Sequence, residues 1–272
     1  MTTTKTTVAT ESGHWYDAKT GEPRYTIVGK NGKERPTRIT DAREKGYVPS
    51  VTTITKVMAA PGLTKWLQRQ VLLSALTLPR KPDESEDDYA ERVMEDAEEQ
   101  SLKAREQGTE FHGRIERFLS SRAPLSEADD AVQAVLRKCI DADVPILEGK
   151  AEKSFACADG YGGKVDWNDG AIIVDFKTKD TIKDEKKLAY NEHVMQLAAY
   201  AHGMGIENPR CLNVFIGVRD GKVVVHDWPA HEIERGLRMF KLCLALWQEI
   251  NNWTAHLSAS ESLDRQLKAA GW

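Results

Sequence analysis

The sequence contains few cysteines and no long apolar run. Its four cysteines are scattered through 272 residues and none forms the closely spaced pair that is typical of zinc sites. No segment reaches the roughly 18 to 20 apolar residues that a transmembrane helix needs. Residues 1–15 also lack the apolar stretch of a signal peptide. We therefore expect reduced thiols, no membrane partner and a cytoplasmic location.

The sequence also lacks a net positive charge. It has 38 Lys and Arg against 42 Asp and Glu, which gives a formal net charge of −4. A protein that only coats DNA would usually be basic. An enzyme that holds a metal with carboxylates can be acidic overall and still keep a basic track for a nucleic acid. The charge balance therefore argues against a DNA-coating role, but not against such an enzyme.

The pattern of apolar residues divides the chain into several predicted parts. Residues 1–46 are expected to form a polar tail and a small β segment, with a hairpin turn at Asn31-Gly32. Residues 47–145 are expected to be mainly helical, with N-caps at Ser50 and Ser126. The helix that follows Ser126 has a predicted buried face of Val132, Val135, Leu136 and Ile140.

Residues 146–255 have the pattern of an α/β core, followed by a polar helix or tail at 256–272. The predicted elements of the core are strands at 146–158, 162–168 and 171–178, a helix at 186–205, a strand–turn–strand unit at 211–228 and a helix at 231–253. This order indicates a mixed α/β fold, with a mixed central sheet flanked by helices and a helical N-terminal part.

The sequence Asp175-Phe176-Lys177 ends an apolar strand. Alternate residues of a strand share a face, so Asp175 and Lys177 should point one way and Phe176 the other. An acid and a lysine at this spacing suit a functional site. Taken alone, the pattern is a weak signal, and an ion pair at a strand end is the commoner explanation.

Asp166 is a second candidate carboxylate, on the strand that precedes Asp175. In a hairpin around residues 168–170, Asp166 should lie across from the start of the next strand and Asp175 further along it. Twist or a bulge could still bring both carboxylates around one cation. Two carboxylates suit Mg²⁺ or Mn²⁺, which prefer oxygen ligands. The alternative is an aspartate that only caps a turn.

Two predicted helices add polar pairs at a spacing of four residues. His112 and Glu116 should share one helical face, where an imidazole and a carboxylate could join a metal site. Gln196 and Tyr200 should share a face of a later helix. The alternatives are a surface His–Glu pair and an ordinary polar helix position with a tyrosine at the core edge.

These segments, taken in order, resemble the PD-(D/E)xK nuclease superfamily and, more narrowly, its RecB-like branch. The matching segments are Gly108…His112…Glu116, Gly163-Lys164-Val165-Asp166, Asp175-Phe176-Lys177 and Gln196…Tyr200. The segment 49–54 resembles one in mitochondrial genome maintenance exonucleases and related phage exonucleases. The resemblance covers roughly residues 47–250 and implies a restriction-endonuclease-like core. Val165 stands where the superfamily's name-giving proline would be.

The resemblance also implies roles for individual residues. One or two Mg²⁺ or Mn²⁺ ions would be bound by His112, Asp166, Asp175 and the Phe176 carbonyl. The implied catalytic residues are Asp166, Asp175, Lys177 and Glu116, and Glu152 matches an acidic position of the branch. The implied DNA-binding residues are Gln196, Tyr200, Arg114, Thr178 and Lys179. Relatives with an iron–sulfur cluster need four clustered cysteines, so we expect no such cluster here.

The resemblance implies a DNA exonuclease that hydrolyses single- or double-stranded DNA from its ends. Such an enzyme would act in recombination, repair or phage DNA processing, in a bacterial or phage-infected cytoplasm. Its expected protein partners are further copies of itself or a single-strand annealing or binding protein. Two alternatives stay open: an endonuclease of the same superfamily, and a non-catalytic DNA-binding subunit. The Asp166, Asp175 and Lys177 set argues against the non-catalytic alternative.

Overall fold

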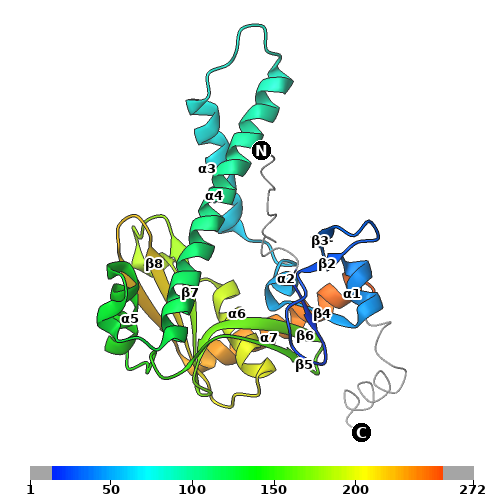
Figure 1. Ribbon diagram of the computed structural model, residues 1–272. Helices are drawn as coiled ribbons and strands as arrows, with labels where there is room; N and C mark the ends of the chain where they lie inside the picture. Colours follow the sequence, from blue (N-terminus) through cyan, green and yellow to red (C-terminus); the bar gives the residue numbers. More distant parts are fainter. Residues whose placement is uncertain (1–13, 254–272) are drawn as a thin grey trace.

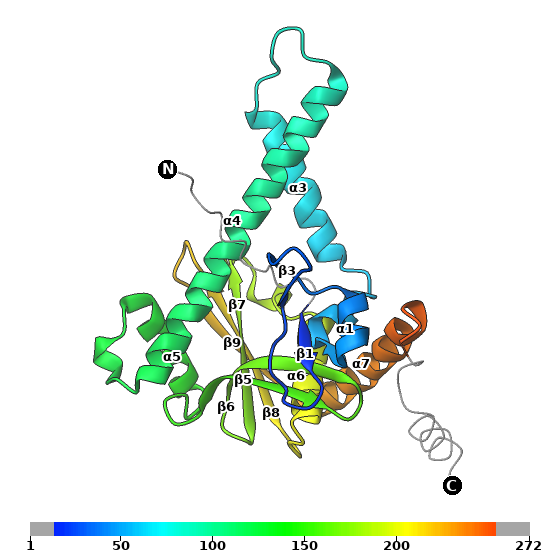
Figure 2. The ribbon, with the colours of Figure 1, turned by 45° about the vertical axis from the view of Figure 1, so that its right-hand side comes forward.

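The structure is a computed structural model that describes residues 14–253 (Figure 1). It confirms a mixed α/β fold, with a five-stranded sheet in the order β5-β6-β7-β8-β9 and helices on both faces. A pair of long helices projects from this body as an arm (Figures 1 and 2). The predicted tail that precedes residue 14 and the predicted polar helix at 256–272 lie outside the described residues.

The central sheet forms where the apolar pattern predicts it. Its strands are β5 (Lys150–Cys157), β6 (Tyr161–Asn168), β7 (Ile172–Lys179), β8 (Arg210–Gly217) and β9 (Val223–Trp228). Neighbouring strands are antiparallel except β7 and β8, which are parallel. The parallel pair follows from the connection, because α6 (Asn191–Gly203) crosses over between these strands.

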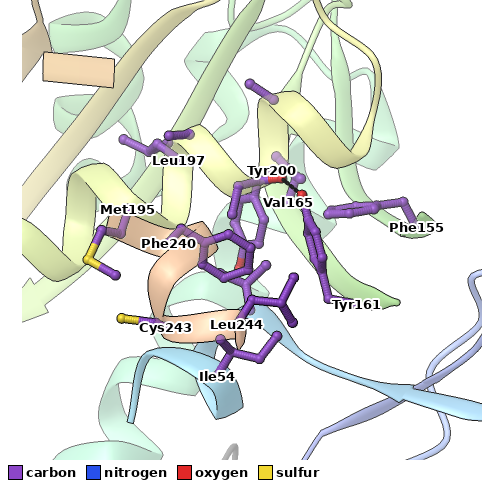
Figure 3. Close-up of a cluster of buried hydrophobic side chains, with 14 of the residues drawn as sticks. Ile54, Phe155, Tyr161, Val165, Met195, Leu197, Tyr200, Phe240, Cys243 and Leu244 are labelled. Carbon is purple, nitrogen blue, oxygen red and sulfur yellow. Dashed lines mark hydrogen bonds between the residues drawn. The ribbon is translucent and has the colours of Figure 1, made fainter. Parts of the chain in front are cut away.

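Alternation along the strands sends apolar side chains into two cores. Ile173 and Cys211 face a core with α6 and α7 (Ala230–Ile250), whereas Val174 and Leu212 face a core with α4 (Glu86–Ser121) and α5 (Asp130–Asp141). Figure 3 shows the first core, in which Tyr161 packs against the α7 residue Phe240. The Tyr161 hydroxyl donates to the carbonyl of Ala199 at 2.9 Å, so its polar atom is satisfied inside this core.

The N-terminal β segment packs onto the body. The predicted turn at Asn31-Gly32 is confirmed, and it lies between β2 (Thr26–Val28) and β3 (Glu34–Pro36). β1 (Trp15–Asp17) pairs with β4 (Tyr47–Pro49), with α1 (Ile39–Lys45) between them in sequence. The Trp15 ring lies 6.2 Å from that of Trp247 and 5.4 Å from that of Trp253. The predicted boundary after residue 46 therefore runs through a packed two-stranded sheet.

One predicted helix cap is confirmed and the other is wrong. The Ser50 hydroxyl accepts the Thr53 amide at the start of α2 (Val51–Thr55). Ser126 instead lies inside the short 3₁₀ helix η1 (Leu125–Glu127), and Asp129 caps α5 (Asp130–Asp141). A residue within a helical turn cannot supply the extended backbone that an N-cap needs.

The buried face of α5 also differs from the prediction at one position. Val132, Val135 and Leu136 are buried as expected, but Ile140 is 43 % exposed. Cys139 is fully buried in its place. Cys139 follows Leu136 by three positions and Val135 by four, which is the spacing of neighbours on one helical face. It therefore completes the apolar stripe that faces the sheet.

The arm consists of α3 (Pro61–Thr77) and α4 (Glu86–Ser121), an uninterrupted helix of 36 residues. Near the tip, the Tyr89 hydroxyl donates to the carbonyls of Ala75 and Leu78, which ties the two helices together. From there α4 runs down to the sheet and passes beside β7 (Figure 2). Within residues 14–253, none of the helices combines the length and apolar character needed to cross a membrane.

His193, in the first turn of α6, is buried and forms no ion pair within residues 14–253. Its Nδ1 accepts the Tyr190 amide at 3.2 Å, and its ring packs 5.4 Å from that of Phe215. Burial, followed by the charges of Lys177 and Lys179, lowers the pKa of His193 to about 2. The folded protein therefore keeps this imidazole neutral at pH values where the unfolded chain would protonate it.

This histidine should make the fold sensitive to acid. The unfolded state takes up a proton near pH 6.5 and the folded state does not, so stability falls as the pH falls through that value. Between about pH 7.5 and about pH 5, the wild type should lose about 2 kcal/mol more of its free energy of unfolding than His193→Asn. Urea unfolding at both pH values measures this difference. An identical pH dependence in the two proteins would contradict it.

Candidate active site

The candidate site lies just beyond the paired region of β6 and β7, where the two strands separate. Their ladder consists of Asn168 paired with Ile173 and Trp167 paired with Val174. Continuing this register by one step places Asp166 opposite Asp175. The expectation that Asp166 would face the start of β7 is therefore wrong, because the short hairpin sets the register so that the two aspartates face each other.

A third acidic residue occupies the corresponding position on β5. The β5–β6 ladder pairs Ala151 with Trp167 and Lys153 with Val165, which leaves Glu152 opposite Asp166. Glu152 has a left-handed backbone, with φ of 57°, and its carboxylate forms an ion pair with Lys164. Three successive strands therefore carry acidic residues at adjacent positions, a pattern that like-charge repulsion disfavours in an ordinary sheet.

The Asp166 carboxylate accepts a hydrogen bond across the parted strands. Its Oδ2 accepts the Phe176 amide at 2.8 Å, so a side chain takes the place of a backbone ladder partner. The same oxygen lies 3.6 Å from Nδ1 of His112 on α4. The His112 ring packs edge-on to Phe176, with 6.2 Å between centroids. Asp166 therefore links β7 to α4.

Gly108 explains how α4 comes close enough to deliver His112. A Cβ atom at Gly108 would lie 2.8 Å from Oγ1 of Thr178 on β7, which is closer than real Cβ contacts allow. Glycine therefore lets the helix approach the strand closely, and His112 follows one turn later on the same face. Thr178, predicted to bind DNA, lies against α4 at this contact.

Most of the predicted metal-site residues line one small cleft beside α4. Its lining consists of His112, Ile115, Glu116, Glu152, Asp166 and Phe176. The side chain of Glu116 shares this cleft with His112, as the spacing on one helical face predicts. All of the lining residues except Ile115 are singled out from the sequence, and α4, β5, β6 and β7 bring them together here.

Four further predicted residues form a series of hydrogen bonds that leads from β7 to α6: Asp175, Lys177, Gln196 and Tyr200. Lys177 Nζ lies 2.8 Å from Oδ2 and 3.0 Å from Oδ1 of Asp175, which is 2 % exposed. Lys177 also donates to Oε1 of Gln196 at 3.0 Å, and Nε2 of Gln196 donates to the Tyr200 hydroxyl at 2.8 Å. Asp175 and Lys177 therefore share one side of β7, as predicted.

These hydrogen bonds change the interpretation of Gln196 and Tyr200. The resemblance predicts that both bind DNA, yet Tyr200 is only 4 % exposed. Their hydrogen bonds hold the Lys177 ammonium beside Asp175. The contacts favour a role in positioning Lys177.

The charges of the cleft residues His112 and Asp166 influence those of Asp175 and Lys177, and the reverse. Burial, reinforced by the negative charge of Asp166, raises the pKa of Asp175 to about 6. Burial also acts to raise the pKa of Asp166, but His112 and Lys177 outweigh it and the pKa is lowered. Burial acts to lower the pKa of His112, but the charge and hydrogen bond of Asp166 outweigh it and the pKa is raised. The protonation of the cleft residues is therefore coupled to the charges of Asp175 and Lys177.

Two of the predicted DNA-binding cations have partners within the protein. Arg114 forms an ion pair with Asp129, the N-cap of α5, and lies 5.0 Å from the ring centre of Phe111. These contacts tie α4 to α5. Lys179 lies 5.6 Å from the ring centre of Tyr190, and burial, followed by the charge of Lys177, lowers its pKa. Lys179, unlike Arg114, therefore adds its positive charge to that of Lys177.

The described residues contain no group of three or more His, Cys, Asp or Glu side chains already arranged around one point as a metal site. The hydrogen bonds explain this arrangement. Asp166 is directed to the Phe176 amide, and Asp175 to Lys177 and Asn213. Each carboxylate has about four lone-pair positions, so these bonds leave acceptor capacity on both.

The sequence interpretation missed Asn213. This residue is fully buried in β8, directly beside Asp175 in the parallel ladder, and its Nδ2 donates to Asp175 Oδ2 at 2.7 Å. The available signal was a single amide within the otherwise apolar residues 211–217. A polar group is costly to bury without a partner, so such a residue marks a buried polar contact.

No family model matches the chain, and the search of curated proteins found no match. Among solved structures, the crystal structure of SSO0001 is similar over 66 % of this chain and 85 % of that chain, at 15 % identity. The TM-score of 0.25 is too low to carry an argument about fold or activity.

The close contact of α4 with β7 can be tested by a double-mutant cycle. Alone, Gly108→Ala should destabilise the fold by about 1 kcal/mol or more, because its methyl group meets Thr178. In a Thr178→Ala background it should instead stabilise by up to about 1 kcal/mol, the helix-propensity gain of alanine over glycine. Urea unfolding of the four proteins gives the coupling energy. Gly113→Ala, on the same helix, is the control and should show no coupling to Thr178→Ala. Equal effects of Gly108→Ala in both backgrounds would contradict the account.

Proposed function

We propose that this chain is a metal-dependent nuclease with a PD-(D/E)xK core, and that it acts on DNA as an exonuclease of the RecB-like type. The observation that carries the proposal is the placement of Asp166 and Asp175 opposite each other where two strands part, with Lys177 bonded to Asp175. The five-stranded mixed sheet between helical layers supports it. So does the ordered set of residues that resembles this superfamily.

The residues present fit a hard divalent cation. Asp166, Asp175, the Phe176 carbonyl and His112 offer oxygen and nitrogen donors, which suit Mg²⁺ or Mn²⁺. Glu116 and Glu152 add two carboxylates to the same cleft, where a second ion or an outer hydrogen bond would use them. Bound there, the cation would lower the pKa of a coordinated water and stabilise negative charge on a phosphate.

Lys177 supplies the fixed positive charge of the proposed site. Asp175 and Gln196 hold its ammonium group, and a quarter of the side chain is exposed. A cation already held in position stabilises the charge that develops on a phosphate without reorganising during the reaction. In this proposal Gln196 and Tyr200 act by positioning Lys177. Lys179, two residues further along β7, adds positive charge for the phosphodiester backbone.

The exonuclease assignment depends on the N-terminal segment 49–54, because this segment carries the narrower resemblance. Ser50, the N-cap of α2, forms a parallel bridge with Gly162 on β6. Ile54 of the same helix is fully buried in the core beneath α6 and α7. The segment thus packs against the strand that carries Asp166, which supports a shared role.

Removing the central charges should abolish catalysis and spare the fold. Asp175→Asn and Lys177→Ala should each lower Mg²⁺- or Mn²⁺-dependent cleavage of linear DNA by about 100-fold or more. End-labelled single- and double-stranded oligonucleotides provide the measurement, with circular dichroism as the test of folding. Lys183→Ala, an exposed lysine that follows the same strand, is the matched control and should keep its activity. Near-normal cleavage by Lys177→Ala would overturn the assignment.

Substrate topology separates the exonuclease from an endonuclease. We expect rapid digestion of linear DNA and none of covalently closed circles of the same sequence, because an exonuclease needs an end. A single nick or cut introduced beforehand should make the circles susceptible. Cleavage of intact circles at the rate of linear DNA would exclude the exonuclease and leave an endonuclease of the same superfamily.

A further inference from the structure

Asn213 occupies an unusual position for an amide. It is fully buried in β8, where it pairs with Asp175 of β7 on one side and His226 of β9 on the other. Burying an amide costs free energy unless its donors and its acceptor find partners. Asn213 has a partner at each end, Trp228 on one side and Asp175 on the other.

Trp228 determines which way the Asn213 amide points. Its indole Nε1 donates to Oδ1 of Asn213 at 2.8 Å. An indole N–H group is only a donor, so the amide oxygen must face Trp228 and the amide nitrogen must face Asp175. The Trp228 ring is itself held edge-on to His226, with 4.4 Å between centroids. A tryptophan at the end of β9 thus fixes an amide on β8.

The fixed amide acts on one oxygen of the Asp175 carboxylate. Nδ2 of Asn213 donates to Oδ2 at 2.7 Å, while Lys177 contacts both Oδ1 and Oδ2. A hydrogen bond from a donor that is itself fixed restricts the rotation of the carboxylate, as outer hydrogen-bond partners do for metal ligands.

We propose that Trp228 and Asn213 form a positioning relay that orients the Asp175 carboxylate for its cation. The inference rests on the proposed function, since it assigns Asp175 a metal. It goes further by making metal affinity depend on β8 and β9, whose residues the nuclease resemblance does not assign. Neither residue of the relay touches substrate in this proposal, so both are positioning residues.

The test removes the indole donor and keeps the aromatic packing. Trp228→Phe should weaken Mn²⁺ binding to the full-length protein about 10-fold, the lower end of the effect of losing an outer-shell partner of a metal ligand. A Mn²⁺ titration followed by the EPR signal of the free ion gives this affinity without relying on catalysis. Trp247→Phe is the matched control. Trp247 is buried in the core between Trp15 and Trp253 and takes no part in the relay.

The outcomes separate the relay from the proposed nuclease. Trp228→Phe should lose Mn²⁺ affinity while Trp247→Phe keeps it, even where urea unfolding shows similar losses of stability. Asn213→Leu should weaken the affinity at least as much as Trp228→Phe. Unchanged affinity in Trp228→Phe, or an equal loss in Trp247→Phe, would overturn the relay alone, provided that the wild type binds Mn²⁺ and Asp175→Asn does not. A wild type that binds no Mn²⁺ would overturn the proposed function and the relay with it.

Discussion

The repulsion between Asp166 and Asp175 is the constraint on which the rest of the site depends. Two carboxylates at facing positions of neighbouring strands disfavour an ordinary ladder, and here the ladder ends one step before them. The Phe176 amide stabilises Asp166, whereas Lys177 and Asn213 stabilise Asp175. Each of these donors offsets part of the cost of placing negative charge inside the protein. A divalent cation between the carboxylates would offset more of that cost, and this electrostatic argument underlies the proposed function.

The layers around the sheet support this arrangement from both sides. On one side, Gly108 allows α4 to approach β7 closely enough for His112 to reach Asp166. On the other side, Gln196 extends from α6 to Lys177. Behind β7, the parallel strand β8 brings Asn213 beside Asp175, and β9 adds Trp228. The site therefore depends on strands and helices that are far apart in sequence.

The local sequence pattern predicts the helices and strands well. It does not predict which residues pair across neighbouring strands, because this register depends on contacts between distant segments. The period of two in 171–178 is enough to place Asp175 and Lys177 on one side, because strand alternation is a local property. The facing of Asp166 and Asp175 depends on which residues pair across a hairpin, and single-strand patterns leave this open. Asn213 was missed because its partner lies on a parallel strand joined through a helix. Ser126 failed as a cap because a 3₁₀ turn, with Asp129 after it, competes for the same stretch.

The most direct test of the account is the position of a bound Mn²⁺ ion, located by anomalous X-ray scattering from crystals soaked with or grown in Mn²⁺. The account predicts a peak between the carboxylates of Asp166 and Asp175, within coordination distance of both and of the Phe176 carbonyl. The Lys177 ammonium should then lie beside the ion and retain its bond to Gln196. A peak elsewhere, or none at a Mn²⁺ concentration that supports cleavage, would contradict the central claim.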